Sequence, residues 1–175
     1  GGTLNYTYLW SDGLTIDDRT NLQAGTYTVT VTDAHSCVTT GSWVVTQPNR
    51  LYICCYYDVH ETCNENNNGQ TEVVPVGGTE PYTYLWSNGR TTKVISGLSA
   101  GTYTVTVWDA NSCSVTGSTI ITQPDLLSVS GVMTHETCNE SNNGAINITA
   151  SGGTPGYTYL WSDGPTSEDR TLLNA

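Results

Sequence analysis

The chain repeats itself with a period of about 75 residues, and this repetition constrains its fold more than any other feature. The pattern GGTxxYTYLWS occurs three times, at residues 1–11, 77–87 and 152–162. Its tryptophans, Trp10, Trp86 and Trp161, are separated by 76 and 75 residues. A unit of this length can enclose a small hydrophobic core of its own. The period therefore predicts tandem domains and disfavours a solenoid of shorter units.

The repeat divides the 175 residues into three pieces. Residues 1–48 are the C-terminal part of one repeat, residues 49–124 are a complete repeat, and residues 125–175 are the N-terminal part of the next. Because the first residue corresponds to Gly77 and the last to Ala100, we expect the natural polypeptide to continue at both ends. Proline at the joint after residue 122 ends strand pairing and stiffens the connection. We therefore expect consecutive domains to form a rod.

Charge and cysteine content limit the possible partners and the cellular compartment of the protein. The formal net charge is −11 with only five basic residues, which argues against nucleic acid and against an anionic membrane surface as partners. No apolar run reaches the length of about 18 residues that a membrane-spanning helix needs, so we expect no membrane insertion. Six cysteines, most of them at recurring positions, indicate an oxidising compartment. The protein is therefore expected to be extracellular, either secreted or on the cell surface.

Apolar and polar residues alternate with the two-residue period of β-strands. In residues 26–31 and 102–107, Tyr and Val fall on one face and Thr on the other, as in a half-buried antiparallel strand. Asn88-Gly89 and its counterparts in the other copies predict tight turns. No segment has a helical apolar stripe, so the expected fold class is all-β, with tandem immunoglobulin-like antiparallel β-sandwich domains. In the complete repeat we expect strands near 50–57, 70–76, 82–87, 91–96, 102–108 and 115–122.

Residues 77–113 carry a family resemblance in the run GGTEPYTYLWSNGRTTKVISGLSAGTYTVTVWDANSC. This run resembles the SprB-type repeat of very large surface adhesins of gliding and biofilm-forming Bacteroidota. Residues 1–37 resemble the same repeat, and residues 152–175 resemble its first half. The resemblance implies an immunoglobulin-like or PKD-like sandwich, export, display at the cell surface, and a role in adhesion or gliding. It implies no catalytic residues.

Two cysteine positions recur in each repeat, and Cys63 and Cys113 represent them in the complete one. We predict a Cys63–Cys113 disulfide, because small secreted domains usually need internal staples and closing this loop would stabilise the domain by about 4 kcal/mol. Cys37 and Cys138 would then pair outside residues 1–175 or with a neighbouring repeat. The alternative is pairing between neighbouring repeats, as Cys37–Cys63 and Cys113–Cys138. The adjacent pair Cys54-Cys55 does not recur, and one of its thiols is a candidate for a bond to another chain.

Glycans and exposed aromatic residues are the candidate surface features. The sequons mark Asn5, Asn139 and Asn147 as candidates for N-glycosylation. Trp108 follows an inward-facing valine, so alternation places it on an outer face. Exposed aromatic rings can stack on sugar rings or bury themselves against another chain. The candidates for contact with a surface polysaccharide or another chain are Trp108, Trp43, Tyr52, Tyr56 and Tyr57.

We expect no metal site and no cofactor, with calcium kept as the one candidate cation. The motif HETC recurs, but a structural zinc needs four ligands and the cysteines are better explained by disulfides. Calcium needs several converging oxygen ligands, and carboxylates recur beside the domain joint. The candidates are Glu61, Glu65, Glu136 and Glu140.

No enzyme is expected, because the chain offers neither a nucleophile–base pair nor a phosphate-binding loop that precedes a helix. The leading interpretation is a structural repeat segment of a long secreted cell-surface adhesin or extracellular fibre. Its partners would be neighbouring repeats of the same chain and further copies in a fibre. The alternative is a carbohydrate-binding module that acts through its exposed aromatic residues.

Overall fold

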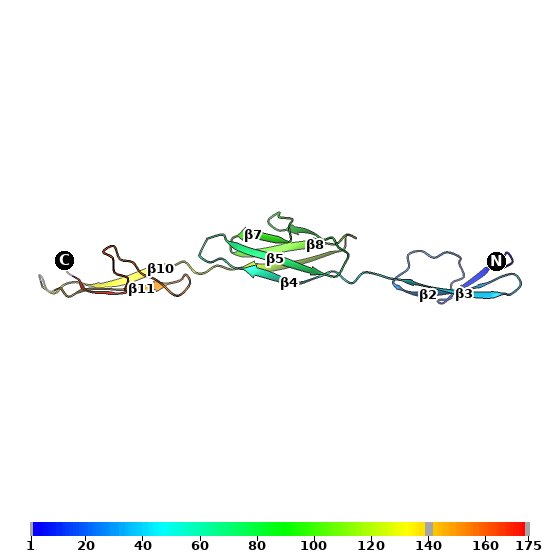
Figure 1. Ribbon diagram of the computed structural model, residues 1–175, viewed down its shortest axis with the longest axis horizontal. Helices are drawn as coiled ribbons and strands as arrows, with labels where there is room; N and C mark the ends of the chain where they lie inside the picture. Colours follow the sequence, from blue (N-terminus) through cyan, green and yellow to red (C-terminus); the bar gives the residue numbers. More distant parts are fainter. Residues whose placement is uncertain (1, 139–141, 174–175) are drawn as a thin grey trace. The chain divides into compact units, whose positions relative to one another are not determined.

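The computed structural model describes residues 2–138 and 142–173, in which all regular secondary structure is β-strand (Figure 1). Within these ranges the strands form four antiparallel sheets of three strands each. The expected all-β fold is confirmed. The strands are β1 Thr7–Trp10, β2 Gly25–Thr32, β3 Val38–Val45, β4 Tyr52–Val59, β5 Gly69–Val76, β6 Thr83–Trp86, β7 Val94–Leu98, β8 Gly101–Trp108, β9 Ser114–Ile121, β10 Ser128–Thr134, β11 Gly144–Ser151 and β12 Arg170–Leu173.

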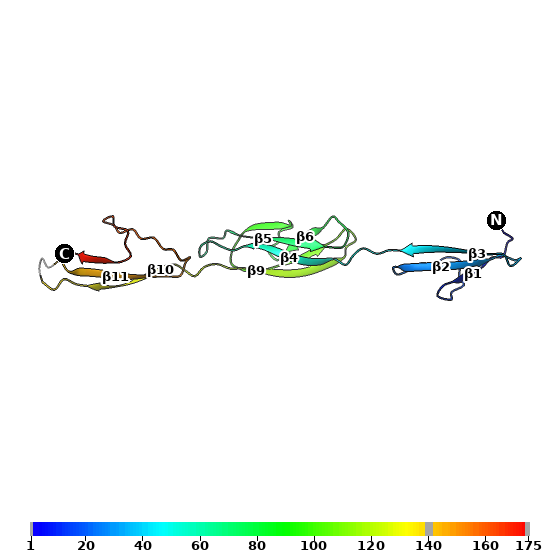
Figure 2. The ribbon, with the colours of Figure 1, turned by 60° about the horizontal axis from the view of Figure 1, so that its bottom comes forward.

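Residues 50–124 contain two of the sheets, β4-β5-β7 and β6-β8-β9, which pack against each other as a sandwich (Figure 2). We call this part the middle sandwich. Its core takes side chains from both sheets, among them Val73 of β5, Trp86 of β6 and Val105 of β8. Each of these three side chains is no more than 2 % exposed. Full burial of an apolar side chain of this kind contributes about 1.5–3 kcal/mol, so the shared core holds the two sheets together.

Strand β8 shows how alternation produces this packing. Tyr103, Val105 and Val107 point into the sandwich, where both valines are fully buried. Thr106 points outward and its hydroxyl lies 3.1 Å from that of Thr116 on the neighbouring strand β9. The six strands expected in the complete repeat are confirmed, each within three residues at either end.

The chain divides into two compact units, Gly1–Asn49 and Arg50–Ala175. The first contains the sheet β1-β2-β3, which we call the N-terminal sheet and which has the register of β6-β8-β9. Trp10 lies opposite Val29, as Trp86 lies opposite Val105. The Trp10 indole N–H donates to the carbonyl of Ile16 at 2.8 Å. Within residues 2–49 no second sheet covers the inner face of these strands.

Residues 128–173 contain the fourth sheet, β10-β11-β12, which we call the C-terminal sheet and which has the strand order of β4-β5-β7. The segment 157–161 corresponds in sequence to residues 82–86, which include β6, yet it forms no strand. A strand needs a hydrogen-bonded neighbour, and no strand of the β8 kind follows within residues 142–173. The loop after Trp161 nevertheless has the same hydrogen bond as the loop after Trp86. The Trp161 indole N–H donates to the carbonyl of Ser167 at 2.9 Å, as that of Trp86 donates to the carbonyl of Thr92.

Candidate functional site

A buried carboxylate fixes the hairpin that precedes the last strand of the middle sandwich. Asp109 is 6 % exposed, and one of its oxygens accepts the backbone N–H groups of Asn111 and Cys113, each at 2.9 Å. The other oxygen accepts the N–H of Thr79 at 3.0 Å. Burial opposes ionisation, but these bonds outweigh it and hold the pKa of the Asp109 carboxyl below its ordinary value. Asp33 makes the equivalent bonds in the N-terminal unit, with Thr3, His35 and Cys37.

A second carboxylate organises the loop at the other end of the middle sandwich. Glu61 is 4 % exposed, and its two oxygens accept the backbone N–H groups of Asn67, at 2.7 Å, and Ala100. Its own N–H donates to the carbonyl of Thr122 at 3.0 Å. The residue therefore ties together the loop after β4, the turn before β8 and the end of β9. This role explains why the position recurs without invoking a bound cation.

The other calcium candidates show no shared arrangement. Glu65 is exposed, and its N–H donates to the side-chain oxygen of Gln123 at 3.0 Å. Glu140 lies outside the described residues, whereas Glu136 is half-buried. In the ranges 2–138 and 142–173 no group of three or more His, Cys, Asp or Glu side chains is arranged to hold a metal ion. Calcium binding stays a prediction.

The structure does not bring together the cysteines of the predicted disulfide. Cys113 precedes the first residue of β9, whereas Cys63 lies in the loop whose Glu61 bonds to Thr122, just after the last residue of β9. The eight residues of β9 span about 27 Å at the usual rise of a strand. A disulfide needs α-carbons within about 7 Å, so a Cys63–Cys113 bond is incompatible with this fold and the pairing needs correction.

None of the cysteines Cys37, Cys54, Cys55, Cys63 and Cys113 forms a disulfide within the part of the chain that the structure describes. Cys37 and Cys113 are exposed on equivalent hairpins, and Cys138 is exposed after β10. The alternative pairs between neighbouring repeats, Cys37–Cys63 and Cys113–Cys138, stay predictions.

The vicinal cysteines lie at a β-bulge in the edge strand β4. The register with β5 shifts between Ile53 and Cys55, which leaves Cys54 as an extra residue. A hydrogen bond with the Cys55 thiol raises the pKa of the Cys54 thiol. The C-terminal sheet has no shift at this point, so the bulge explains why the pair does not recur.

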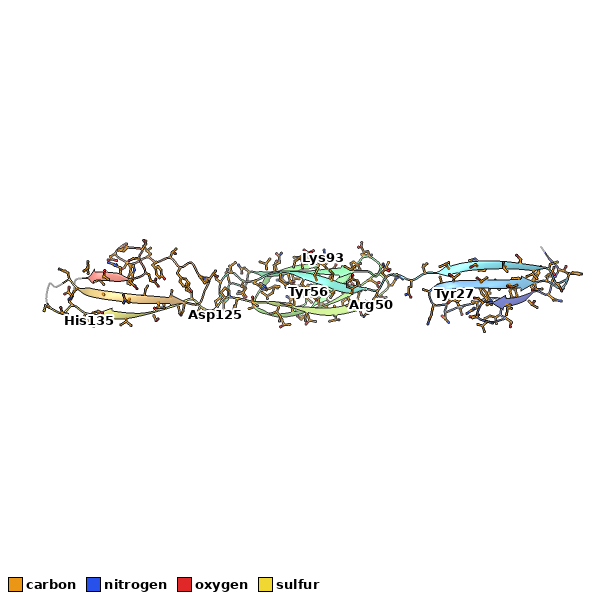
Figure 3. All side chains as sticks on the ribbon, turned by 90° about the horizontal axis from the view of Figure 1, so that it is seen from below. Tyr27, Arg50, Tyr56, Lys93, Asp125 and His135 are labelled. Carbon is orange, nitrogen blue, oxygen red and sulfur yellow. The ribbon has the colours of Figure 1, made fainter. Side chains whose placement is uncertain are left out.

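The three tyrosines of β4 do not form one cluster. Tyr56 points into the middle sandwich and packs against its core (Figure 3). Its buried hydroxyl has no hydrogen-bond partner, and burial together with the nearby Asp58 carboxylate raises the pKa of Tyr56. Tyr52 and Tyr57 lie on the outer face and are 49 % and 63 % exposed. Only these two remain available for contacts with a sugar or another chain.

Of the two tryptophans that do not recur, one lies on the outer face of its sheet and the other on the inner face. Trp108 is half-buried and lies opposite Thr83 and Ser114, on the outer face of its sheet. Trp43 lies on the inner face, because its ring centroid is 6.5 Å from that of Trp10. Trp43 is 58 % exposed. It therefore belongs to the face that a second sheet covers in the middle sandwich, and not to an outer binding surface.

An arginine–aspartate pair distinguishes the two flanking sheets from the middle sandwich. Arg19 bonds to Asp12 at 2.8 Å, and Arg170 bonds to Asp163 at 2.7 Å. Each guanidinium also lies over the tryptophan of its own copy, at 5.3 Å and 5.5 Å from the ring centroid. The corresponding residue of the middle sandwich is Ile95, which is 2 % exposed in the core. The acidic residues at 17–18 and 168–169 thus directly precede the arginine that both flanking repeats share. Among the described residues they do not form a group of side chains that could hold a metal ion.

Two of the three sequons lie on exposed surface. Asn5 is exposed in the loop before β1, and Asn147 is exposed on β11. Asn139 lies outside the described residues. N-glycosylation at these positions stays a prediction.

A comparison with known protein families identifies the repeat. The family model of the SprB repeat matches residues 59–91 and 130–166, which confirms the resemblance seen in the sequence. The SprB repeat is a structural repeat associated with cell-surface proteins and is not an enzyme family. No curated protein matches the chain. Among the described residues no helix has the length and apolar character needed to cross a membrane.

Proposed function

We propose that this chain of SprB-type repeats is a structural segment of a long secreted cell-surface adhesin or extracellular fibre. In this proposal each repeat is a spacer that holds a distal binding element away from the cell. The observation that carries it is the path of the chain through the middle sandwich, of which residues 59–91 match a repeat associated with cell-surface proteins.

The chain enters and leaves the middle sandwich at opposite ends. Leu51 packs beside Gly78 near the Asp109 hairpin, at the end where β4 begins. Thr122 follows β9 and bonds to Glu61 at the other end. Opposite entry and exit add the full length of each sandwich to the reach of a tandem array, as a spacer requires.

The joint after the middle sandwich is held by several bonds, which supports a stiff connection. The side-chain amide of Asn64 donates to the carbonyl of Pro124 at 3.1 Å, and the N–H of Glu65 donates to Gln123 at 3.0 Å. On the other side of the joint, the N–H of Gly153 donates to the carbonyl of Asp125 at 2.7 Å. We therefore expect consecutive repeats to form a rod.

The alternative function, carbohydrate binding, has weaker support. The exposed rings of Tyr52 and Tyr57 lie on the outer face of the sheet of β4, whereas Trp108 lies on the outer face of the other sheet. Tyr52 and Tyr57 share one face, but Trp108 lies on the other sheet, so no single surface gathers all three exposed rings into one sugar-binding platform.

Two measurements on the same chain separate the proposals. Small-angle scattering should give the cross-section of a thin rod, and a glycan array should show no binding. Binding to a defined glycan that is lost in Tyr52→Ala or Tyr57→Ala, but kept in Trp108→Ala, would instead favour the carbohydrate-binding function. A compact particle without glycan binding would refute the spacer.

A further inference from the structure

We propose that two copies of this chain pair through the outer face of the sheet β4-β5-β7 and are joined there by a disulfide between their Cys54 residues. This face belongs to the middle sandwich, which is a complete domain with a closed core. The inference goes beyond the spacer role, because it concerns how chains associate and not how far one chain reaches.

The bulge in β4 places both cysteines on this outer face. Ile53 and Tyr56 both point into the sandwich, where they pack against its core. Because of the bulge, two residues lie between them instead of one, namely Cys54 and Cys55. Cys55 lies opposite Val74, which points outward because the residue before it is fully buried. The two thiols share a hydrogen bond, so Cys54 lies beside Cys55 on the outer face.

Apolar side chains surround the two thiols. We call these residues together the thiol face: Tyr52, Cys54, Cys55, Tyr57 and Val59 of β4, Val74 and Val76 of β5, and Val94 of β7. Tyr57, Val59 and Tyr52 are 63 %, 52 % and 49 % exposed. An exposed apolar surface of this kind marks a site of contact with another molecule.

The same face of the C-terminal sheet is mostly polar, although its strand order is the same. By register, the residues at the places of Tyr52, Cys55, Tyr57, Val74 and Val76 are Ser128, Ser130, Val132, Thr149 and Ser151. The hydroxyl oxygens of Ser128 and Ser151 lie 2.8 Å apart. The fold therefore does not require apolar residues on this face, and the thiol face is a property of the middle repeat.

The residues between the two exposed tyrosines favour a protein partner over a sugar. Sugar sites combine aromatic rings with polar groups that bond to the hydroxyls of the ligand. Between Tyr52 and Tyr57 the thiol face offers two thiols and the valine opposite them. Glu72 is the one charged residue that β4, β5 and β7 place on this side, and its carboxylate is already bound to the Nζ atom of Lys93 at 2.7 Å.

The same ion pair favours a second copy of this chain as the partner. The formal net charge of −11 makes two copies repel each other over much of their surface. On the thiol face the charge of Glu72 is neutralised by Lys93. Two acidic chains can therefore meet here without bringing like charges into contact.

The layout of β4 fits a two-fold pairing. Tyr52 lies two residues before the cysteine pair, and Tyr57 lies two residues after it. A two-fold axis that passes through the pair and runs across the strands sets Tyr52 of one copy against Tyr57 of the second copy. It also sets Cys54 beside its own counterpart, as a disulfide between identical residues requires. The face is thus complementary to itself.

The size of the face explains why a covalent bond is needed. Three strands of up to eight residues cover about 27 Å by 14 Å, which is roughly 400 Å². A stable interface buries about 800 Å² on each partner. Apolar contact alone should therefore give a brief encounter, which the disulfide makes permanent.

Cys54 is the thiol that forms the bond, because it is exposed whereas Cys55 is half-buried. The oxidant is a small-molecule disulfide. One Cys54 thiolate displaces a thiol from it, and the Cys54 thiolate of the second copy displaces the other thiol from the mixed disulfide. One S–S bond forms between the chains, the oxidant is reduced to two thiols, and these take up the two protons that the cysteines lose.

A bond within the vicinal pair is disfavoured by geometry. Adjacent α-carbons lie about 3.8 Å apart, whereas disulfides usually need at least about 4.4 Å. The hydrogen bond with Cys55 also raises the pKa of the Cys54 thiol, so little thiolate is present at neutral pH. Oxidation therefore depends on the docking that brings two Cys54 thiols together.

Oxidation of a 175-residue chain that keeps only the vicinal cysteines tests the proposal. The cysteines replaced by serine are all exposed: Cys37, Cys63, Cys113 and Cys138. With oxidised glutathione, disulfide-linked dimers should form, and peptide mapping should recover a link between two Cys54 residues. Cys54→Ser should abolish the dimer, whereas Cys55→Ser should keep it.

A matched pair of lysine variants separates docking from random collision. Tyr57→Lys should slow dimer formation about tenfold or more, because it puts a charge inside the apolar contact. Ile120→Lys should leave the rate unchanged, because Ile120 is similarly exposed, at 59 %, but lies on the outer face of the other sheet. Urea midpoints of both variants check that the sandwich is intact.

Three results would overturn the proposal. The first is a chain that forms no dimer under oxidation at any concentration. The second is a monomer lighter by two hydrogen atoms, which would show a bond between Cys54 and Cys55. The third is an equal rate of dimer formation in Tyr57→Lys and Ile120→Lys, which would show that the thiol face does not guide the two chains.

Discussion

Replacing Gly117 by alanine tests how tightly the middle sandwich is packed between its two sheets. A β-carbon at this position collides with the hydroxyl of Tyr56 and lies 3.0 Å from the Cδ1 atom of Ile53. Overpacking of this kind costs about 1–3 kcal/mol, and the lower entropy of alanine in the unfolded chain returns about 0.4–1 kcal/mol. We therefore expect Gly117→Ala to lower the free energy of unfolding by about 1–2 kcal/mol.

The hydroxyl of Tyr56 should carry most of this effect. It is buried without a hydrogen-bond partner, so Tyr56→Phe alone should be neutral or stabilising by up to about 1 kcal/mol. In the Tyr56→Phe background the ring atom Cζ is 3.6 Å from the added methyl group, which is an ordinary contact. The cost of Gly117→Ala should then fall by about 1 kcal/mol or more.

Urea unfolding followed by circular dichroism measures the four members of this cycle. Gly25→Ala is the control for glycine replacement in a strand, because a β-carbon there meets only the Tyr27 ring at 3.8 Å or more. An equal cost of Gly117→Ala in the wild type and in the Tyr56→Phe background would refute the reasoning. Such a result would mean that Ile53 or the backbone, and not the hydroxyl, limits the space.

Three further predictions follow from the buried carboxylates and the cysteines. The pKa of Asp109 is lowered in the folded state, so the stabilisation that its carboxylate provides is complete above its ordinary pKa of 3.8 and is lost as the pH falls through the folded value. The urea concentration at the unfolding midpoint, measured between about pH 5 and pH 2.5, should therefore fall less steeply in Asp109→Asn than in the wild type. Glu61→Ala should lower the melting temperature of the middle sandwich by several degrees through the loss of two buried bonds, whereas Glu65→Ala should leave it nearly unchanged, as thermal scans of both variants can show. Peptide mapping of the oxidised chain should recover no peptide that links Cys63 to Cys113, and a quantitative yield of that link would contradict the strand order of the sandwich.

Local sequence patterns are sufficient to predict the strands and the sandwich. The alternation around Val105 and the Asn88-Gly89 turn are properties of a few neighbouring residues, and the structure follows them closely. The tryptophan of the repeat, Trp86, is in the core as its recurrence suggests. Features of this kind depend on periodicity, which a single sequence contains in full.

Features that depend on pairing across the fold cannot be predicted in the same way. The Cys63–Cys113 hypothesis is wrong because recurrence gives no information about which end of β9 each cysteine occupies. Trp43 does not recur in the other repeats, which suggests a position on the outer surface. Its pairing with Tyr27 nevertheless places it on the inner face of the N-terminal sheet. The sequence reasoning misses Asp33 and Asp109, but their recurrence 76 residues apart, four residues before a cysteine in each case, is a usable signal.

The opposite placement of entry and exit in the middle sandwich also determines how it bears mechanical load. A force applied through Leu51 and Thr122 acts along the strands β4 and β9, each of which is bonded to an antiparallel neighbour. The ladder bonds run across the strands, so this force shears them together and does not peel them one after another. A tether built from such units would resist sudden tension, and its weakest element would be the ladder of β4, which the bulge at Cys54 interrupts near its pulled end.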